Sequence, residues 1–207
     1  MLLNSEQKAA ITYKGGPLLI IAGAGTGKTT VITERIKHLI LKEKAATDQI
    51  LALTFTQKAA GEMEERVDIA LPYGYTDLWV MTFHAFCDRL LRDEAAQIGL
   101  NPDYRLASEA ESLKLLQDNL FSLPLNYFRP LGNPTRFLDG LFRHFSRLKD
   151  EDVNPEEYLL WAKNLKTERE EKEKYLELAK VYQKYEEIKI KEGLMDFGDL
   201  ITQVLTL

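Results

Sequence analysis

One short segment of the sequence has the residue types and spacing of a phosphate-binding loop. It reads Ala22-Gly23-Ala24-Gly25-Thr26-Gly27-Lys28-Thr29, close to the pattern of glycine, four residues, then Gly-Lys-Ser/Thr, with alanine in the first position. Glycines let a backbone approach phosphates and turn its N–H groups toward them. The Lys28 ammonium would reach the β- and γ-phosphates, and the Thr29 hydroxyl would ligate Mg²⁺. The segment predicts a site for ATP, or a close relative, with Mg²⁺.

The elements around this loop are those that its chemistry requires. A buried strand is predicted at residues 18–22 and a helix at 29–41, whose positive dipole end would face the phosphates. Strands at 50–54 and 78–82 follow, each leading into a helix, at about 58–70 and 84–97. This alternation predicts an α/β fold with a parallel sheet. A glycine-rich turn with an incidental lysine is the alternative, and the strand–loop–helix order argues against it.

Beyond Gly99 helical periodicity dominates, and no further strand is predicted before Gly193. A long charged helix is expected over 167–192, with one buried stripe and Gly193 as its stop; the stripe holds Tyr175, Leu178, Tyr182 and Tyr185. An apolar helix is expected over 200–207. Asp196 and Asp199 precede it, and although two acids near a phosphate loop could ligate Mg²⁺, their spacing is the ordinary start of a helix.

Composition excludes several classes of protein. With 45% hydrophobic and 29% charged residues, the chain of 207 residues is expected to be soluble and globular. Its apolar runs are too short to cross a bilayer, and no secretory signal is predicted. The single cysteine, Cys87, fits a reducing cytoplasm. The net charge of −5 does not decide the partners, because the first 92 residues hold 11 basic and 10 acidic side chains and the remainder holds 16 and 22.

Five segments together resemble superfamily 1 DNA helicases of the UvrD, Rep and PcrA type. They occur in the family's order and span nearly the whole chain, at residues 3–11, 22–30, 50–67, 81–87 and 195–201. The resemblance implies a P-loop RecA-like parallel sheet with an all-helical inserted subdomain. Residues 1–92 would be the first part of the ATP-binding domain and 93–193 the insertion, with the first domain resuming at about 194–207.

The resemblance also implies how a nucleotide would be bound. Gln7 would recognise adenine through its amide, although Asn4 and Gln7 also have the spacing of a capping box. Arg66 would lie near the nucleotide, with a solvated helix arginine as the alternative. The full nucleotide-binding set would be Gln7, Ala22, Gly23, Ala24, Gly25, Thr26, Gly27, Lys28, Thr29, Thr30 and Arg66, with Lys28 and Thr29 serving catalysis.

The resemblance further implies that a single DNA strand binds where the second and third predicted strands end, which is the edge where α/β folds place ligands. Phe55 can stack on an unpaired base, with core packing as its alternative. Thr56, Gln57 and Lys58 would contact the DNA backbone, although the family often has asparagine where Gln57 stands. Thr82, Phe83 and His84 form a similar set, with helix capping as the alternative for His84.

A basic face on the insertion is predicted without any resemblance. Residues 135–149 form an amphipathic helix on which Arg136, Arg143 and Arg147 align opposite the apolar side. Residues 129–149 carry five basic side chains against one acid. We hypothesise that this face touches duplex phosphates ahead of the unwinding junction, and a solvated basic face is the alternative.

Hydrolysis needs an aspartate and a glutamate beyond the phosphate loop. The Asp-Glu pair at Asp93-Glu94 falls within a helical pattern rather than at a strand end. We therefore expect an N-terminal piece of a longer 3′–5′ helicase, inactive alone and dependent on a second RecA-like domain. The alternatives are the helicase part of a recombinational helicase–nuclease, a non-hydrolysing nucleotide-gated DNA-binding module, and a small-molecule kinase.

Overall fold

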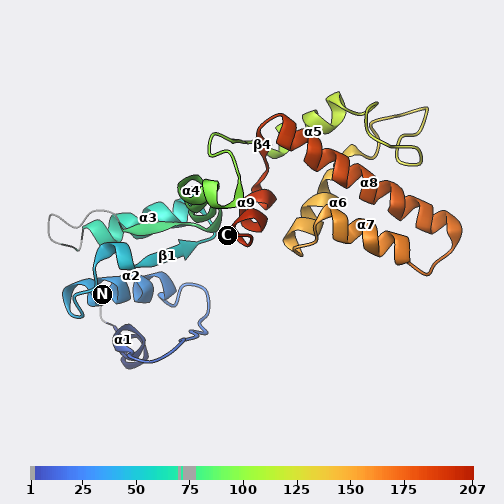
Figure 1. Cartoon of the computed structure of the whole chain (residues 1–207). Coiled ribbons are helices and arrows are strands. Elements are labelled where there is room, and N and C mark those ends of the chain that lie inside the picture. The colour runs from blue at the N-terminus through green and yellow to red at the C-terminus, as the bar shows by residue number, and fades with distance from the viewer. Residues whose placement is uncertain (1–2, 70, 72–77) are drawn as a thin grey trace. The chain divides into compact units, whose positions relative to one another are not determined.

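The computed structural model describes residues 3–69, 71 and 78–207, and the chain divides into two compact units, 1–86 and 87–207 (Figure 1). None of the helices in these described ranges combines the length and apolar character that a membrane-spanning helix needs. The prediction that the first domain resumes at about residue 194 stays a prediction.

The first unit alternates helices and strands, as predicted. Its elements are α1 (Ser5–Thr12), α2 (Lys28–Leu41), a 3₁₀ turn at Thr47–Gln49, β1 (Leu51–Thr54), α3 (Gln57–Asp68), β2 (Trp79–Thr82) and the first turn of α4 (Phe83–Glu94). The strands predicted at 50–54 and 78–82 and the three helices beside them are confirmed. The predicted end of one helix at residue 70 lies outside the described residues.

The two strands of this unit are parallel and in register, with Thr54 opposite Thr82. Apolar side chains from both strands and both neighbouring helices form one core; they are Ile36 and Ile40 of α2, Met63 and Val67 of α3, Ile50, Ala52 and Val80. Figure 1 shows α2 and α3 running alongside β1. Because the strands are parallel and in register, Thr54 and Thr82 end them at one edge of the sheet.

The buried strand predicted at residues 18–22 is not formed. This segment belongs to none of the described strands, and its apolar side chains face solvent, with Leu19 83% and Ile21 89% exposed. An apolar run becomes a buried strand only when neighbouring strands pair with it and helices cover it. The two described strands of this unit pair with each other instead.

The second unit is mainly helical. After α4 come a 3₁₀ turn (Ala95–Ile98), β3 (Arg105–Leu106), α5 (Glu109–Asp118), α6 (Leu138–Asp150), α7 (Pro155–Asn164), α8 (Arg169–Lys191), β4 (Leu194–Met195) and α9 (Phe197–Val204). The long helix predicted over 167–192 is confirmed as α8, and Gly193 follows it with a φ of 64°. A central core joins its helices through Phe145, Ala162, Ala179, Val181 and Tyr182.

Two expectations for this unit need correction. β3 and β4 form a short parallel pair, fixed by Arg105 N–H donating to Gly193 O at 2.9 Å and Ala107 N–H donating to Met195 O at 2.7 Å. Two-residue strands carry no periodicity, so tertiary packing alone reveals them. Helix α6 begins at Leu138 rather than 135, because residues 134–137 form turns, such as that from Arg136 N–H to Asn133 O.

Candidate nucleotide and nucleic-acid sites

The phosphate loop has the backbone that its glycines were expected to provide. Gly25 and Gly27 have φ angles of 75° and 90°, in the left-handed region that favours glycine. Helix α2 begins directly after Gly27, which is its N-cap and makes no side-chain capping bond. The first-turn N–H groups of α2 therefore point toward the loop without a capping side chain, which is the arrangement that binds anions.

Polar side chains close this loop upon itself. The Lys28 ammonium donates to the carbonyls of Ala22 and Gly23 at 2.8 and 2.7 Å, and the Thr26 hydroxyl donates to Gly23 O at 2.8 Å. Lys28 is exposed and Thr29 partly exposed, so both are accessible to a ligand. Glycine backbone, helix start, ammonium and hydroxyl fit a triphosphate with its Mg²⁺, which Thr29 would hold.

Gln7 makes the capping box and also reaches the phosphate loop. Its Oε1 accepts from Asn4 N–H at 3.0 Å, and Asn4 Oδ1 accepts from Gln7 N–H at 2.7 Å. The Gln7 side-chain amide donates to Thr26 O at 3.1 Å. The capping alternative for Gln7 is therefore confirmed, and it places the side-chain amide beside the loop; the adenine contact stays a prediction. Arg66 lies in the last turn of α3, half-exposed and 3.6 Å from Glu62.

The sheet edge brings two aromatic rings together. Phe55 follows β1 and Phe83 follows β2, and their ring centroids are 5.7 Å apart with the planes tilted by 41°. Phe55 is 93% exposed and Phe83 44% exposed. The core-packing alternative for Phe55 is therefore excluded in this structure. Two exposed rings at the carboxyl edge of parallel strands form a surface on which unpaired bases can stack.

The hydroxyls beside these rings cap helices. Thr56 Oγ1 accepts from Ala59 N–H at 3.1 Å at the start of α3, and Thr82 Oγ1 accepts from Ala85 N–H at 3.2 Å in α4. Thr82 is buried, whereas His84 is half-buried. Gln57 begins α3, and Lys58 is highly exposed, 4.0 Å from Glu62. The threonines therefore hold the helices that follow the two rings.

The three arginines of the predicted basic face are all exposed, two of them on α6 and one in the turn before it. Arg143 and Arg147 lie exposed on α6, and Arg143 pairs with Asp139 at 3.2 Å. Arg136 lies in the turn before α6, with its guanidinium 5.2 Å from the Phe137 ring centroid. Lys149, counted among the five basic side chains of 129–149, is buried and does not contribute. We define the basic face as Arg136, Arg143 and Arg147.

The segment at residues 126–128, which precedes the basic face in the sequence, is anchored by one carboxylate. Glu177 of α8 accepts hydrogen bonds from the N–H groups of Asn126, Tyr127 and Phe128 at 2.8, 3.0 and 3.0 Å. A carboxylate that accepts several backbone N–H bonds is a strong anchor. Glu177 therefore fixes the course of the chain toward Arg136, although no sequence signal pointed to it.

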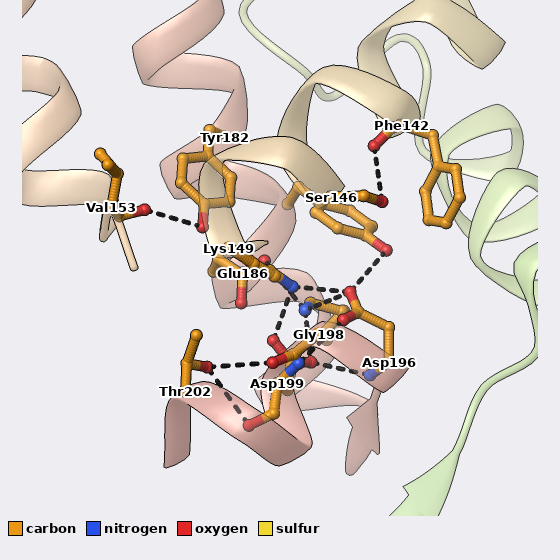
Figure 2. Close-up of polar contacts among 12 residues, drawn as sticks. Phe142, Ser146, Lys149, Val153, Tyr182, Glu186, Asp196, Gly198, Asp199 and Thr202 are labelled. Carbon is orange, nitrogen blue, oxygen red and sulfur yellow. Dashed lines mark hydrogen bonds and ion pairs between the residues drawn. The ribbon is translucent and has the colours of Figure 1, made fainter. Parts of the chain in front are cut away.

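Lysines from two helices meet three carboxylates inside the second unit (Figure 2). We call this group the ion cluster; its members are Lys149 of α6, Lys189 and Glu186 of α8, and Asp196 and Asp199 at the start of α9. Lys149 Nζ lies 2.6 Å from Asp196 Oδ2, 2.6 Å from Asp199 Oδ1 and 2.9 Å from Glu186 Oε1. Lys189 Nζ lies 2.8, 2.6 and 2.9 Å from oxygens of the same three acids.

The ion cluster explains the helix start at Asp196. Asp199 N–H donates to Asp196 Oδ1 at 3.1 Å and Asp196 N–H to Asp199 Oδ2 at 2.7 Å, so the predicted capping role is confirmed. Both carboxylates also form ion pairs with Lys149 and Lys189, a role that was not predicted from the sequence. A Cβ at Gly198 would lie 2.9 Å from Lys149 Cδ, so glycine there permits the lysine stem to pass. The lysine ammoniums occupy the place that a cation would need.

Comparison with known proteins gives consistent results. Residues 3–207 match the family described as "UvrD/REP helicase N-terminal domain". The chain is 36% identical, over 99% of its length, to a Bacillus subtilis protein named "ATP-dependent DNA helicase PcrA". It is 37% identical over 98% of its length to the Mycobacterium bovis "ATP-dependent DNA helicase UvrD1", and 37% identical over 96% to a Rickettsia conorii "Probable DNA helicase II homolog".

The matched part of each relative is small. The chain covers 26% of the Bacillus protein, 25% of the Mycobacterium protein and 28% of the Rickettsia protein. It therefore spans about a quarter of the length of these relatives.

Proposed function

Since this chain belongs to the UvrD/REP helicase N-terminal domain family, we propose that it is the ATP- and single-stranded-DNA-binding part of an ATP-dependent 3′–5′ DNA helicase. The observation that carries the proposal is the first unit itself. It combines a phosphate loop at the start of α2 with an exposed aromatic pair, Phe55 and Phe83, where two parallel strands end.

The phosphate loop would bind the nucleotide through backbone and side chains together. The α2 N–H groups and the Lys28 ammonium would hold the β- and γ-phosphates, and Thr29 would hold Mg²⁺. Bound Mg²⁺ neutralises charge on the phosphates during transfer. Gln7 lies against the loop through its bond to Thr26 O, which supports its proposed contact with adenine. We also propose Thr30 and Arg66 as neighbours of the nucleotide.

A single DNA strand would follow the edge where β1 and β2 end. Its bases would stack on Phe55 and Phe83, while Gln57, Lys58 and His84 would contact its phosphates. Because Thr56 and Thr82 cap the helices after the two strands, we assign them the role of fixing this edge. Nucleotide-driven movement of a second RecA-like domain would then shift the strand along it.

Replacing Phe55 with alanine should weaken binding of single-stranded DNA by about 5- to 150-fold. Base stacking on an aromatic ring contributes about 1–3 kcal/mol per base, and a tenfold change in affinity corresponds to about 1.4 kcal/mol. Fluorescence anisotropy of a labelled oligothymidine at fixed salt measures the change. Because Phe55 is 93% exposed, its removal should leave the melting temperature unchanged.

Phe121→Ala is the matched control, because Phe121 is an equally large ring, 80% exposed, in the second unit. We expect this control to bind oligothymidine as the unmodified chain does. Equal affinities of Phe55→Ala and the unmodified chain would exclude the aromatic pair as the DNA-binding surface, and with it the observation on which the function rests.

For the insertion, we propose that the basic face contacts phosphates of the duplex ahead of the junction. Replacing Arg136, Arg143 and Arg147 together with alanine should reduce the salt dependence of binding to a duplex with a single-stranded tail. Each phosphate contact contributes about 0.9 to the slope of log K against log salt, so the slope should fall by about 2–3. Titrations at several salt concentrations give the slope.

A triple variant at Arg169, Lys180 and Lys191 removes the same charge from exposed positions of α8. This control should keep most of the original slope, because it changes net charge without touching the basic face. If both triple variants lowered the slope equally, the effect would be one of overall charge, and the proposed duplex contact would be wrong.

We further propose that hydrolysis and directional movement belong to a larger protein, in which a second RecA-like domain completes the nucleotide site. The relatives that carry the helicase names are about four times as long as this chain, which supports that proposal.

We also propose that the protein works in the cytoplasm. Its single cysteine, which is buried, supports this place.

A further inference from the structure

The ion cluster holds three carboxyl groups and only two ammonium groups, and all five lie inside the second unit. The side chains of Lys149 and Lys189 are 4% and 2% exposed, and those of the three acids between 9% and 20%. If every acid were ionised, the ion cluster would carry one uncompensated negative charge. A buried charge without a partner is costly, and a buried group commonly binds a proton instead.

The three carboxyl groups differ in the hydrogen bonds that they accept. Asp196 accepts bonds from Asp199 N–H and, at 3.4 Å, from Tyr185 O–H, which favour its charged form, and Asp199 accepts a bond from Asp196 N–H. Glu186 accepts none of these bonds. Its Oε1 lies 2.9 Å from both ammonium nitrogens but outside hydrogen-bonding geometry with either. Glu186 is therefore the acid whose charged form is least stabilised.

Water has access to Glu186 from one side. Together with Lys189 and Asp199 it lines a cavity of about 400 Å³, whose wall also includes Tyr104 and Gln203. The titratable groups that face Glu186 are Lys149 on α6, Tyr182, Tyr185 and Lys189 on α8, Asp196 and Asp199 at the start of α9, and Tyr104 across the cavity. A proton can enter through this cavity.

We propose that the ion cluster is a proton-binding site, in which Glu186 takes one proton from water and makes the buried group electrically neutral. The proton occupies Oε2, and Oε1 remains the oxygen that faces both ammonium groups. No covalent bond changes apart from this O–H bond. Neither the nucleotide site nor the DNA-binding edge is needed for the proposal, because every group involved lies within the second unit.

The electrostatic surroundings agree with this assignment. Burial, and next the carboxylate of Asp199, raise the pKa of Glu186, and the ammonium groups of Lys189 and Lys149 offset this only in part. Burial alone would also raise the pKa of Asp196, but the ammonium groups of Lys189 and Lys149 outweigh it and hold that pKa well below its usual range. Glu186 is thus the proton acceptor of the ion cluster, whereas Asp196 stays ionised.

The direction of the pH effect follows from linkage. Between the ordinary glutamate pKa and the raised pKa of Glu186, the folded protein binds one proton more than the unfolded chain. Stability from Glu186 is therefore complete at pH values below the ordinary pKa and is lost as the pH rises through the raised one. The contribution of Asp196 to the pH dependence of stability has the opposite sign. Its stabilisation is present above the ordinary aspartate pKa and is lost as the pH falls.

Two measurements test the proposal on the whole chain. In ¹³C-detected NMR, the Glu186 carboxyl signal, assigned through bonds in the unmodified protein, should titrate at a higher pH than the exposed glutamates. In denaturant unfolding across pH, Glu186→Gln keeps Oε1 and mimics the protonated acid. Relative to this variant, the log of the unfolding constant of the unmodified chain should rise by about one per pH unit between the ordinary glutamate pKa and the raised one.

Glu187→Gln is the matched control, because Glu187 is the exposed neighbour of Glu186 and pairs with Lys184 at 2.8 Å. It should keep the pH profile of the unmodified chain. A Glu186 signal that titrates together with the exposed glutamates would overturn the proposal, even if Glu186→Gln did not fold. So would a Glu186→Gln variant whose unfolding has the original pH dependence.

Discussion

Replacing Lys189 with methionine should destabilise the second unit by about 3–5 kcal/mol, the usual effect of removing one partner from a buried ion pair. Lys189 Nζ contacts an oxygen of Glu186, Asp196 and Asp199, and its side chain is 2% exposed. Methionine fills the space of the lysine stem but leaves three carboxyl groups with one ammonium. The loss therefore comes from uncompensated buried charge rather than from a cavity.

Urea unfolding followed by tryptophan fluorescence measures this loss. Trp79 lies in the first unit and Trp161 in the second, so a Trp79→Phe background reports the second unit alone. Lys184→Met is the control, because Lys184 forms an exposed pair with Glu187, and exposed pairs contribute about 0–1 kcal/mol.

A double variant separates charge from packing. Adding Asp199→Asn to Lys189→Met removes one of the surplus acids and keeps a side-chain oxygen that can accept from Asp196 N–H in the capping box of α9. The double variant should be more stable than Lys189→Met alone. If Lys189→Met cost no more than Lys184→Met, the ion cluster would not hold α6, α8 and α9 together as its distances indicate.

Replacing Lys28 with alanine should weaken binding of the Mg²⁺–ATP complex by about 10- to 100-fold. Hydrogen bonds to charged groups contribute about 1.5–3 kcal/mol, and about 1.4 kcal/mol changes an affinity tenfold. Lys28 supplies the charge at the mouth of the phosphate loop, whereas the glycine backbone and the start of α2 remain in the variant. Residual binding through those N–H groups is therefore expected.

Isothermal titration calorimetry gives the dissociation constant. Lys42→Ala removes the same charge at the opposite end of α2, where Lys42 is exposed, and should bind nucleotide normally. Thermal denaturation of both variants verifies that the fold is kept. An Lys28→Ala protein that bound nucleotide as tightly as Lys42→Ala would show that this loop does not hold the phosphates.

Local features of this protein could be predicted from its sequence. The phosphate loop, the two paired strands and helix α8 depend on short-range patterns: glycine spacing, short apolar runs and a 3.6-residue period. Their positions in the structure agree with prediction to within a few residues. The capping box of Asp196 and Asp199 was likewise visible, because its two partners are three residues apart.

Features that depend on distant partners could not be predicted in the same way. Residues 18–22 read as a buried strand, yet burial requires neighbours that pair with them, and hydropathy says nothing about pairing. Glu177 anchors a segment about fifty residues away, and no spacing rule connects the two. Arg136 lies outside α6, contrary to prediction, because turns after Asn133 place the start of the helix at Leu138.

The lysines of the ion cluster did leave a signal in the sequence. Lys149 is four residues beyond Phe145 and Lys189 four beyond Tyr185, so each continues the apolar stripe of its helix. A lysine on a buried stripe requires a carboxylate partner, since lysine is rarely buried unpaired. Asp196 and Asp199 follow α8 closely in the sequence, so they are natural partners for two buried lysines.

The exposed run at residues 18–21 has a consequence for handling the protein. Leu18, Leu19, Ile20 and Ile21 are 47%, 83%, 41% and 89% exposed, and no charged side chain interrupts them. Uncharged, β-prone segments of this kind are where chains add to one another edge to edge and start to aggregate. We therefore expect aggregation in a concentrated solution to begin at these four side chains.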